Sequence, residues 1–202
     1  MIHDGCHGVA PAPADGGSSM RNAALAAPAR RGFTLVELAV ALAITAVLLG
    51  MAAPSFGRLV AEQQLRNEAR RLSDAIFHAR SEALKRNGPV VICASVPADP
   101  CGPTRLWHEG WLMFADGDAD GTPDPGEPPI GHDGPAESGV TMTGNRPVAH
   151  YLRFDWTGHA RTVSGALQMG TLEVCRAGLV GYHVVLANSG RTRIERMRGT
   201  CP

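Results

Sequence analysis

The segment RRGFTLVELAVALAITAVLLGMAAP, residues 30–54, joins two arginines and a glycine to a long apolar run. Between residues 33 and 53 the only ionisable side chain is that of Glu37. About 20 apolar residues in a helix span a bilayer, and arginines on the N-terminal flank keep that end cytoplasmic. The run therefore predicts a membrane-spanning helix, with an ordinary signal anchor or a cleaved secretory signal as alternatives. A carboxylate in such a segment costs roughly 3 kcal/mol, which indicates a function for Glu37.

The remaining composition limits the domain organisation. The chain has 202 residues, with 19 Lys and Arg against 19 Asp and Glu, so its net charge predicts no partner. Residues 1–32 are rich in Ala, Pro, Gly and Ser without periodicity, so we expect a leader outside the fold, with Met20 as an alternative start. We expect a transmembrane helix at 33–57, an amphipathic helix half at 58–87, and a β-rich globular domain with a basic tail at 88–202.

Helical periodicity continues beyond the apolar run. Apolar residues recur at helical spacing at Phe56, Leu59, Val60, Leu65, Leu72, Ile76, Ala79, Ala83 and Leu84. The arginines on the opposite face are expected to be a solvated surface. Asn87-Gly88-Pro89 should end the helix, with the glycine at the C′ position. The pattern predicts one helix over residues 33–86.

Short β-branched and aromatic runs follow the helix. Gly, Pro and Asp clusters separate predicted strands at residues 90–93, 110–114, 151–155, 172–175 and 182–186. The predicted fold class is α+β, a long N-terminal α-helix packed on a C-terminal antiparallel β domain.

The cysteines indicate an extracytoplasmic domain. Cys6 lies in the expected leader, which leaves Cys93, Cys101, Cys175 and Cys201. An even number in an exported domain suggests disulfides, and three connectivities are possible. Cys93–Cys101 closes a short loop and Cys175–Cys201 ties the tail to a strand, so this connectivity is favoured. No C-x-x-C motif is present, which argues against a metal or redox site.

An acidic loop carries a metal-binding pattern. Asp116, Asp118, Asp120 and Glu127 fit the EF-hand loop D-x-[DN]-x-[DN]-G-x5-E, whose oxygens bind calcium. A predicted strand precedes the loop, however, and several prolines exclude the helix that should follow. An acidic hairpin turn is therefore favoured and calcium is the alternative. No other cofactor is expected.

The C-terminal tail is basic. It has Arg191, Arg193, Arg196 and Arg198 against one acid, Glu195. In an extended segment Arg191 and Arg193 would point to one face about 6.6 Å apart, a spacing suited to DNA phosphates. The alternative is a solvated strand whose arginines pair with the acidic loop, Glu195 or Glu173. Residues 116–137 contain no Lys or Arg, so that edge should repel DNA.

Catalysis finds no support in the sequence. No nucleophile elbow, P-loop, zinc-protease motif or dinucleotide fingerprint is present. His78 on the helix and His108 and His183 on predicted strands are expected to be structural or exposed. The chain is predicted not to be an enzyme.

Gly32-Phe33-Thr34-Leu35-Val36-Glu37 resembles the prepilin peptidase site of type IV pilins and type II secretion pseudopilins. The resemblance implies cleavage after Gly32 and N-methylation of Phe33. It also implies that Glu37 neutralises the terminal amine of a neighbouring subunit during assembly, so that the membrane helix becomes the filament core. Implied partners are the prepilin peptidase, the inner membrane and other pilins or pseudopilins.

Three further stretches resemble the FimT/GspH family of minor pilins and pseudopilins. They are RSEALKRNGPVVIC at residues 80–93, GW-x-x-F-x-D at 110–116 and F-x-x-x-G at 154–158. Gly190-Arg191-Thr192-Arg193 resembles the G-R-x-R tail of FimT-type pilins. The resemblance implies the pilin fold, a periplasmic C-terminal domain, and binding of double-stranded DNA during natural transformation. The alternatives are a structural tip subunit of a type II secretion pseudopilus and a pilus-assembly initiator without DNA binding.

Overall fold

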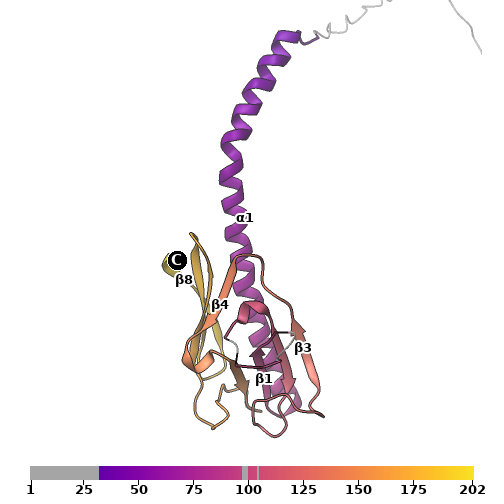
Figure 1. The fold of residues 1–202 in the computed structure, drawn as a ribbon, viewed down its shortest axis with the longest axis vertical. Coiled ribbons are helices and arrows are strands. Elements are labelled where there is room, and N and C mark those ends of the chain that lie inside the picture. Colours follow the sequence, from indigo (N-terminus) through magenta and orange to yellow (C-terminus); the bar gives the residue numbers. More distant parts are fainter. Residues whose placement is uncertain (1–31, 97–99, 104) are drawn as a thin grey trace, which may run out of the picture. The chain divides into compact units, whose positions relative to one another are not determined.

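The computed structural model describes residues 32–96, 100–103 and 105–202, and Figure 1 shows its elements. The expected leader, residues 1–32, lies outside these residues except for Gly32. The chain divides after Thr45 into two units. The elements are α1 (Leu35–Arg86), β1 (Val90–Ala94), η1 (Trp107–Glu109), β2 (Trp111–Ala115), β3 (Pro129–Asp133), β4 (Val140–Gly144), η2 (Arg146–Val148), β5 (Tyr151–Phe154), β6 (Gly170–Arg176), β7 (Val180–Leu186) and β8 (Thr192–Thr200).

Helix α1 ends at Arg86, as predicted, but the residue at the C′ position of its cap differs from the expected one. Asn87 adopts a left-handed φ of 51°. The N–H groups of Asn87 and Gly88 donate to the carbonyl oxygens of Leu84 and Ala83, at 3.4 and 3.2 Å. This is a Schellman motif, in which an asparagine can replace glycine at C′. Asn87 therefore takes the position predicted for Gly88.

The strands form two four-stranded antiparallel sheets, ordered β3-β2-β1-β5 and β4-β6-β7-β8. In the first sheet Ile92 of β1 lies opposite Met113 of β2 and Leu152 of β5. In the second sheet Leu172 of β6 lies opposite Val184 of β7. The predicted α+β class with an antiparallel β domain is confirmed. Strand β8 lies at the edge of the second sheet, which leaves one of its sides without a strand neighbour.

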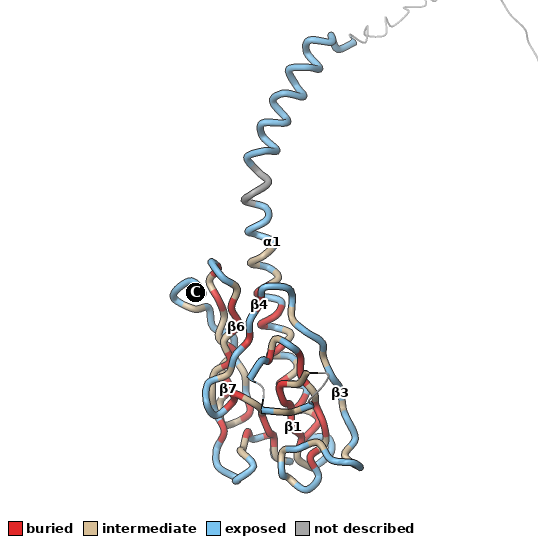
Figure 2. The backbone as a smooth tube through the Cα atoms, viewed as in Figure 1, coloured by how far each residue is buried: buried red, intermediate tan, exposed pale blue. Residues whose placement is uncertain are grey.

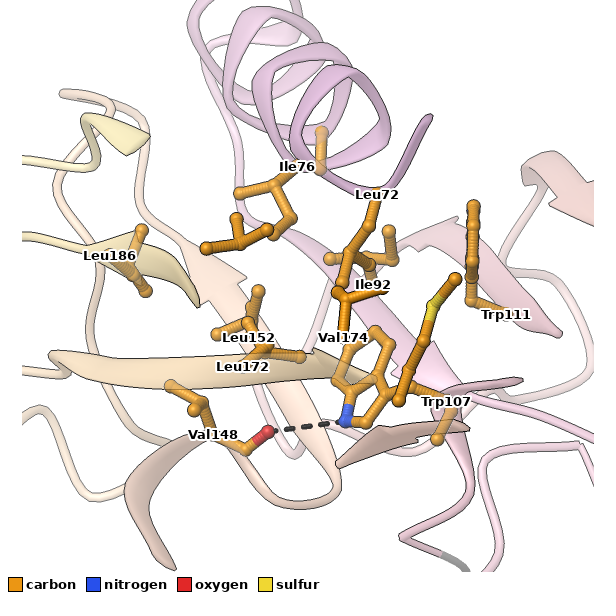
Figure 3. Close-up of a cluster of buried hydrophobic side chains, with 14 of the residues drawn as sticks. Leu72, Ile76, Ile92, Trp107, Trp111, Val148, Leu152, Leu172, Val174 and Leu186 are labelled. Carbon is orange, nitrogen blue, oxygen red and sulfur yellow. Dashed lines mark hydrogen bonds between the residues drawn. The ribbon is translucent and has the colours of Figure 1, made fainter. Parts of the chain in front are cut away.

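The second half of α1 packs against both sheets around one buried core (Figure 3). Leu72 of α1, Ile92 of β1 and Leu172 of β6 are fully buried in this core. Trp107 is also fully buried, and its indole N–H donates to the carbonyl oxygen of Val148 at 3.2 Å. Leu72 is fully buried where α1 packs against the sheets, so Leu72→Ala would leave a cavity there. This substitution should lower the free energy of unfolding by about 2–5 kcal/mol.

The five predicted strands correspond to β1, β2, β5, β6 and β7. Strands β3 and β4 were not predicted, and β8 was considered only as an extended segment of the tail. Strand β3 is an edge strand with mostly exposed side chains, among which only Ile130 packs against the core, so it has no apolar alternation. The prediction that His108 lies on a strand was wrong, because it lies in η1.

Candidate functional site

The segment before α1 contains the expected cleavage site. Gly32, Phe33 and Thr34 have no regular secondary structure, and Phe33 is 84% exposed. The Thr34 hydroxyl accepts the backbone N–H of Glu37 at 3.2 Å. A threonine in this position is an N-cap, and the T-x-x-E spacing is that of a capping box. The helix therefore begins at Leu35. The capping role of Thr34 was not predicted, although the T-x-x-E spacing in the sequence indicates it.

Glu37 and the apolar residues around it are exposed. Figure 2 colours the first part of α1 as exposed. Within the described residues the Glu37 carboxylate has no hydrogen bond or ion pair. Helix α1 is long and apolar enough to cross a membrane, with a mean hydropathy of 2.4 in its most apolar stretch. An exposed apolar surface of this extent requires lipid or other protein to cover it.

The acidic loop between β2 and β3 gathers three carboxylates. Oxygens of Asp116, Asp118 and Asp120 lie within 4.8 Å of one another. Glu127, the last position of the motif, instead accepts the backbone N–H groups of Gly117 and Asp124. Strand β3 follows the loop where an EF-hand would have a helix. The loop is thus an acidic connection between antiparallel strands, as its context predicted.

Asp116 differs from the other two aspartates because it is fully buried. Its Oδ2 forms an ion pair with Nε of Arg153 at 3.0 Å, and its Oδ1 accepts the N–H of Gly121 at 3.2 Å. Both carboxylate oxygens therefore have partners within the protein. Asp118 and Asp120 are less buried and accept backbone N–H groups within the loop.

The loop concentrates negative charge. Desolvation, and then the charges of Asp120, Asp118 and Glu127, raise the pKa of Asp124 above its usual value. No basic side chain of the described residues forms an ion pair with Asp118, Asp120 or Asp124. The exposed carboxylates of the loop therefore leave it with an excess of negative charge.

Disulfide bonds join Cys93 to Cys101 and Cys175 to Cys201, the pairings that the spacing favoured. The second bond links β6 to the end of the tail. The backbone N–H of Cys201 also donates to the carbonyl oxygen of Leu179 at 2.8 Å. The C-terminal tail is therefore attached to the second sheet at the C-terminal end of β8 by both a disulfide and a backbone hydrogen bond.

The four tail arginines are all exposed, but they do not form one row. Strand β8 carries Arg193, Arg196 and Arg198, whereas Arg191 lies in the turn before the strand. The extended spacing expected for Arg191 and Arg193 stays a prediction, since Arg191 directly precedes the first residue of β8. The pairing of β8 with β7 also shifts register between Val180 and Tyr182.

Arg193 and Arg196 lie on opposite faces of β8, because successive strand residues alternate. Arg193 forms an ion pair with Glu195. The hydrogen bond from Arg193, and then its charge, lower the pKa of Glu195 below its usual value. Arg196 instead lies with Ile194 and Tyr182 beside α1. One of the pairings considered for the tail, that with Glu195, is thus present at Arg193.

A glycine fixes the turn that precedes the tail, a role that was not predicted from the sequence. Gly190 has a φ of 76° and donates to the carbonyl oxygen of Ala187 at 2.9 Å. The Ala187 N–H donates to the carbonyl oxygen of Arg191 at 2.9 Å. A Cβ at position 190 would overlap the carbonyl oxygen of Gly158. The turn that carries Arg191 therefore requires glycine for its conformation and for space.

The histidines singled out in the sequence have separate surroundings. His78 lies on α1 with Nε2 3.9 Å from a Glu82 oxygen, and Nδ1 of His108 accepts the N–H of Met142 at 3.2 Å. His183 lies on β7. They belong to three different elements and do not form one site.

Comparison with known proteins places these features in a family. A family profile described as Type II transport protein GspH matches residues 68–190, and one described as Prokaryotic N-terminal methylation motif matches residues 28–53. The chain is 34% identical over 182 residues to the Pilin-like protein PilA1 of Thermus thermophilus, covering 82% of this chain and 99% of that protein. The GspH match ends immediately before Arg191, so the tail arginines lie outside it.

The fold is similar to the crystal structure of the type IV minor pilin FimU from Pseudomonas aeruginosa. The TM-score is 0.51 at 19% identity, covering 68% of this chain and 92% of that chain. At this identity the similarity supports the fold alone. Since the GspH profile covers more than half of the residues and the Thermus relative aligns over nearly its whole length, the chain belongs to the type IV pilin-like proteins of the GspH family.

Proposed function

We propose that this chain is a minor type IV pilin that is built into a pilus and binds double-stranded DNA for natural transformation. The observation that carries the proposal is the exposure of Arg191, Arg193, Arg196 and Arg198 on an edge strand and the turn before it. Within the described residues only Arg193 of these four has an ion pair or a side-chain hydrogen bond. Exposed arginines without partners can bind phosphate oxygens.

Binding of this kind is independent of sequence and weakens with salt. Each phosphate contact releases counterions, so the affinity varies with salt concentration to a power of about −0.9 per contact. At about 0.1 M salt one contact therefore contributes about eightfold in affinity. The acidic loop, in the connection from β2 to β3, would not take part.

We also propose how the subunit enters the filament. Prepilin peptidase would cleave between Gly32 and Phe33, residues 1–32 would be removed, and the new Phe33 amine would be methylated. The exposed, non-helical segment at Phe33 supports access for the peptidase. Glu37, exposed and without a partner among the described residues, would pair with the amine of a neighbouring subunit. Residues 33–57 would then form the filament core and 88–202 the periplasmic domain, with 58–87 joining them.

The test is a DNA titration of the full chain in a neutral detergent with its disulfides formed. Fluorescence anisotropy of a labelled duplex would be measured at about 50 and 200 mM salt, a range over which phosphate contacts weaken strongly. Arg191→Gln/Arg193→Gln should lower the affinity by about sixtyfold at about 0.1 M salt, if both residues contact phosphate. Arg105→Gln/Arg146→Gln removes two exposed charges elsewhere and is the matched control.

A second candidate function is a structural subunit of a type II secretion pseudopilus, without DNA binding. It is favoured by the GspH match to residues 68–190 and by the ion pair that already occupies Arg193. If the wild-type chain shows no binding even at low salt, this structural function, or initiation of pilus assembly, replaces the DNA-binding proposal.

A further inference from the structure

A groove between α1 and β8 brings together arginines that are distant in the sequence. It has a volume of about 470 Å³ and is lined by Arg66, Arg70, Tyr182, Ile194 and Arg196. Arg66 and Arg70 are one helical turn apart, so their Cβ atoms lie about 6 Å apart on one face. Arg196 reaches the groove because it lies directly opposite Tyr182 in the β7–β8 pairing. None of the five lining residues is acidic.

The three arginines of this groove are exposed and uncompensated. Within the described residues, none of their guanidinium groups has a hydrogen bond or ion pair. Other arginines of α1 do have carboxylate partners, since Arg58 pairs with Glu62 and Arg86 with Glu82. Like charges one turn apart destabilise a helix, so Arg66 and Arg70 are not explained by helix stability.

Protection of the sheet edge accounts for only part of this arrangement. A charged residue that points inward from an edge strand prevents pairing with other chains, and Arg196 alone could serve that purpose. It does not explain why Arg66 and Arg70 line the same groove from the helix. Three unpaired guanidinium groups that line one groove can bind an oxyanion, because their planar forks bind phosphate oxygens in pairs.

We propose that Arg66, Arg70 and Arg196 form a phosphate-binding groove that holds the backbone of double-stranded DNA. This inference rests on the proposed DNA-binding function and extends its site from the tail to the helix. Arg196 lies on the face of β8 toward α1 and Arg193 on the opposite face. A DNA backbone that follows the exposed edge of β8 would therefore meet arginines on both sides of the strand.

The test compares the groove with the tail in the full chain, in a neutral detergent and with the disulfides formed. The variants are Arg66→Gln/Arg70→Gln, Arg191→Gln/Arg193→Gln and the combination of both, with Arg105→Gln/Arg146→Gln as the charge-matched control. Thermal unfolding of each variant checks that the fold is retained. The groove variant should lower DNA affinity about sixtyfold at about 0.1 M salt and reduce the salt slope by about 2, while the control stays near wild type.

A second readout measures phosphate binding without DNA. Inorganic triphosphate is titrated calorimetrically into the wild type and the groove variant, and the variant should lose the heat of binding. The groove variant could bind DNA and triphosphate as the wild type does while the tail variant binds DNA more weakly. That result would overturn the proposed phosphate-binding groove and leave DNA binding by the tail in place. If the wild type binds triphosphate but no DNA, or neither, the DNA assignment of the groove fails together with the proposed function.

Discussion

Substitutions in the buried ion pair between Asp116 and Arg153 test whether this pair stabilises the acidic loop. Asp116 is fully buried and Arg153 nearly so, with 3.0 Å between Oδ2 and Nε. Removing one partner of a buried pair leaves an uncompensated charge and costs about 3–5 kcal/mol. We expect Arg153→Met to destabilise the domain by this amount. For a chain of this size each kcal/mol lowers the Tm by about 2–4 °C, which predicts a fall of about 6–20 °C.

Thermal unfolding followed by circular dichroism, in a neutral detergent and under oxidising conditions, measures this change. Asp118→Asn is the matched control, because Asp118 is exposed and accepts a hydrogen bond from the N–H of Asp120 at 3.3 Å. We expect this control to change the unfolding free energy by less than about 1 kcal/mol. Replacing both members of the pair, as Asp116→Leu/Arg153→Met, should recover much of the loss, since buried pairs often exchange for apolar residues at little cost.

A different set of results would refute this reasoning. If Asp116 acts chiefly as a calcium ligand, added calcium should raise the Tm of the wild type. Each of the substitutions Asp116→Asn, Asp118→Asn and Asp120→Asn should then abolish this rise in Tm. Arg153→Met should change the Tm only slightly. An Arg153→Met variant as stable as the wild type would show that the ion pair does not support the loop.

Three further predictions concern the tail. Glu195→Gln should raise DNA affinity about eightfold at about 0.1 M salt, measured by anisotropy, because it releases Arg193 for one phosphate contact. An unchanged affinity would mean that Arg193 does not contact DNA. Gly190→Ala should lower the unfolding free energy by at least about 1 kcal/mol in chemical denaturation, since the new Cβ meets both strain and overlap. Cys175→Ser/Cys201→Ser should cost about 3.5 kcal/mol for its 26-residue separation and should weaken DNA binding with every arginine retained; binding equal to wild type would show that the tail needs no anchoring.

The helix was predictable from the sequence because its signals are local and repeated. Leu65, Leu72 and Ile76 recur at helical spacing, and all three are fully buried in the core. The residues at the helix ends were harder to assign. Thr34 and Asn87 each act through a backbone hydrogen bond or dihedral angle that several neighbouring residues could have supplied. Periodicity identifies a helix, but it does not choose its caps.

The sheets were predictable only where burial gives a pattern. Val140 and Met142 alternate with exposed threonines in β4, so this strand left a short signal, which was missed. Strand β3 has almost no alternation of apolar and polar residues, because it is a mostly exposed strand at the edge of its sheet. The groove could not be predicted at all. Arg66 and Arg196 are distant in the sequence, and only the packing of β8 beside α1 brings them together.

The number of arginines in this chain says little about its ligand, because Lys85 is the only lysine and all other Lys and Arg positions are arginine. The positions of the arginines in the fold are more informative. Among the arginines that the structure describes, those whose side chains have no hydrogen bond or ion pair are residues 66, 70, 105, 146, 191, 196 and 198. Five of these seven lie on the stretch of α1 beside β8, on β8 itself, or in the turn before it. Arginines elsewhere, such as Arg71 and Arg161, are bound to carboxylates or carbonyl groups.

A solvated basic surface would leave unpaired arginines scattered over the domain. Their concentration along one sheet edge leaves like charges together at a cost in stability, and an anionic ligand with many phosphates would offset that cost on binding.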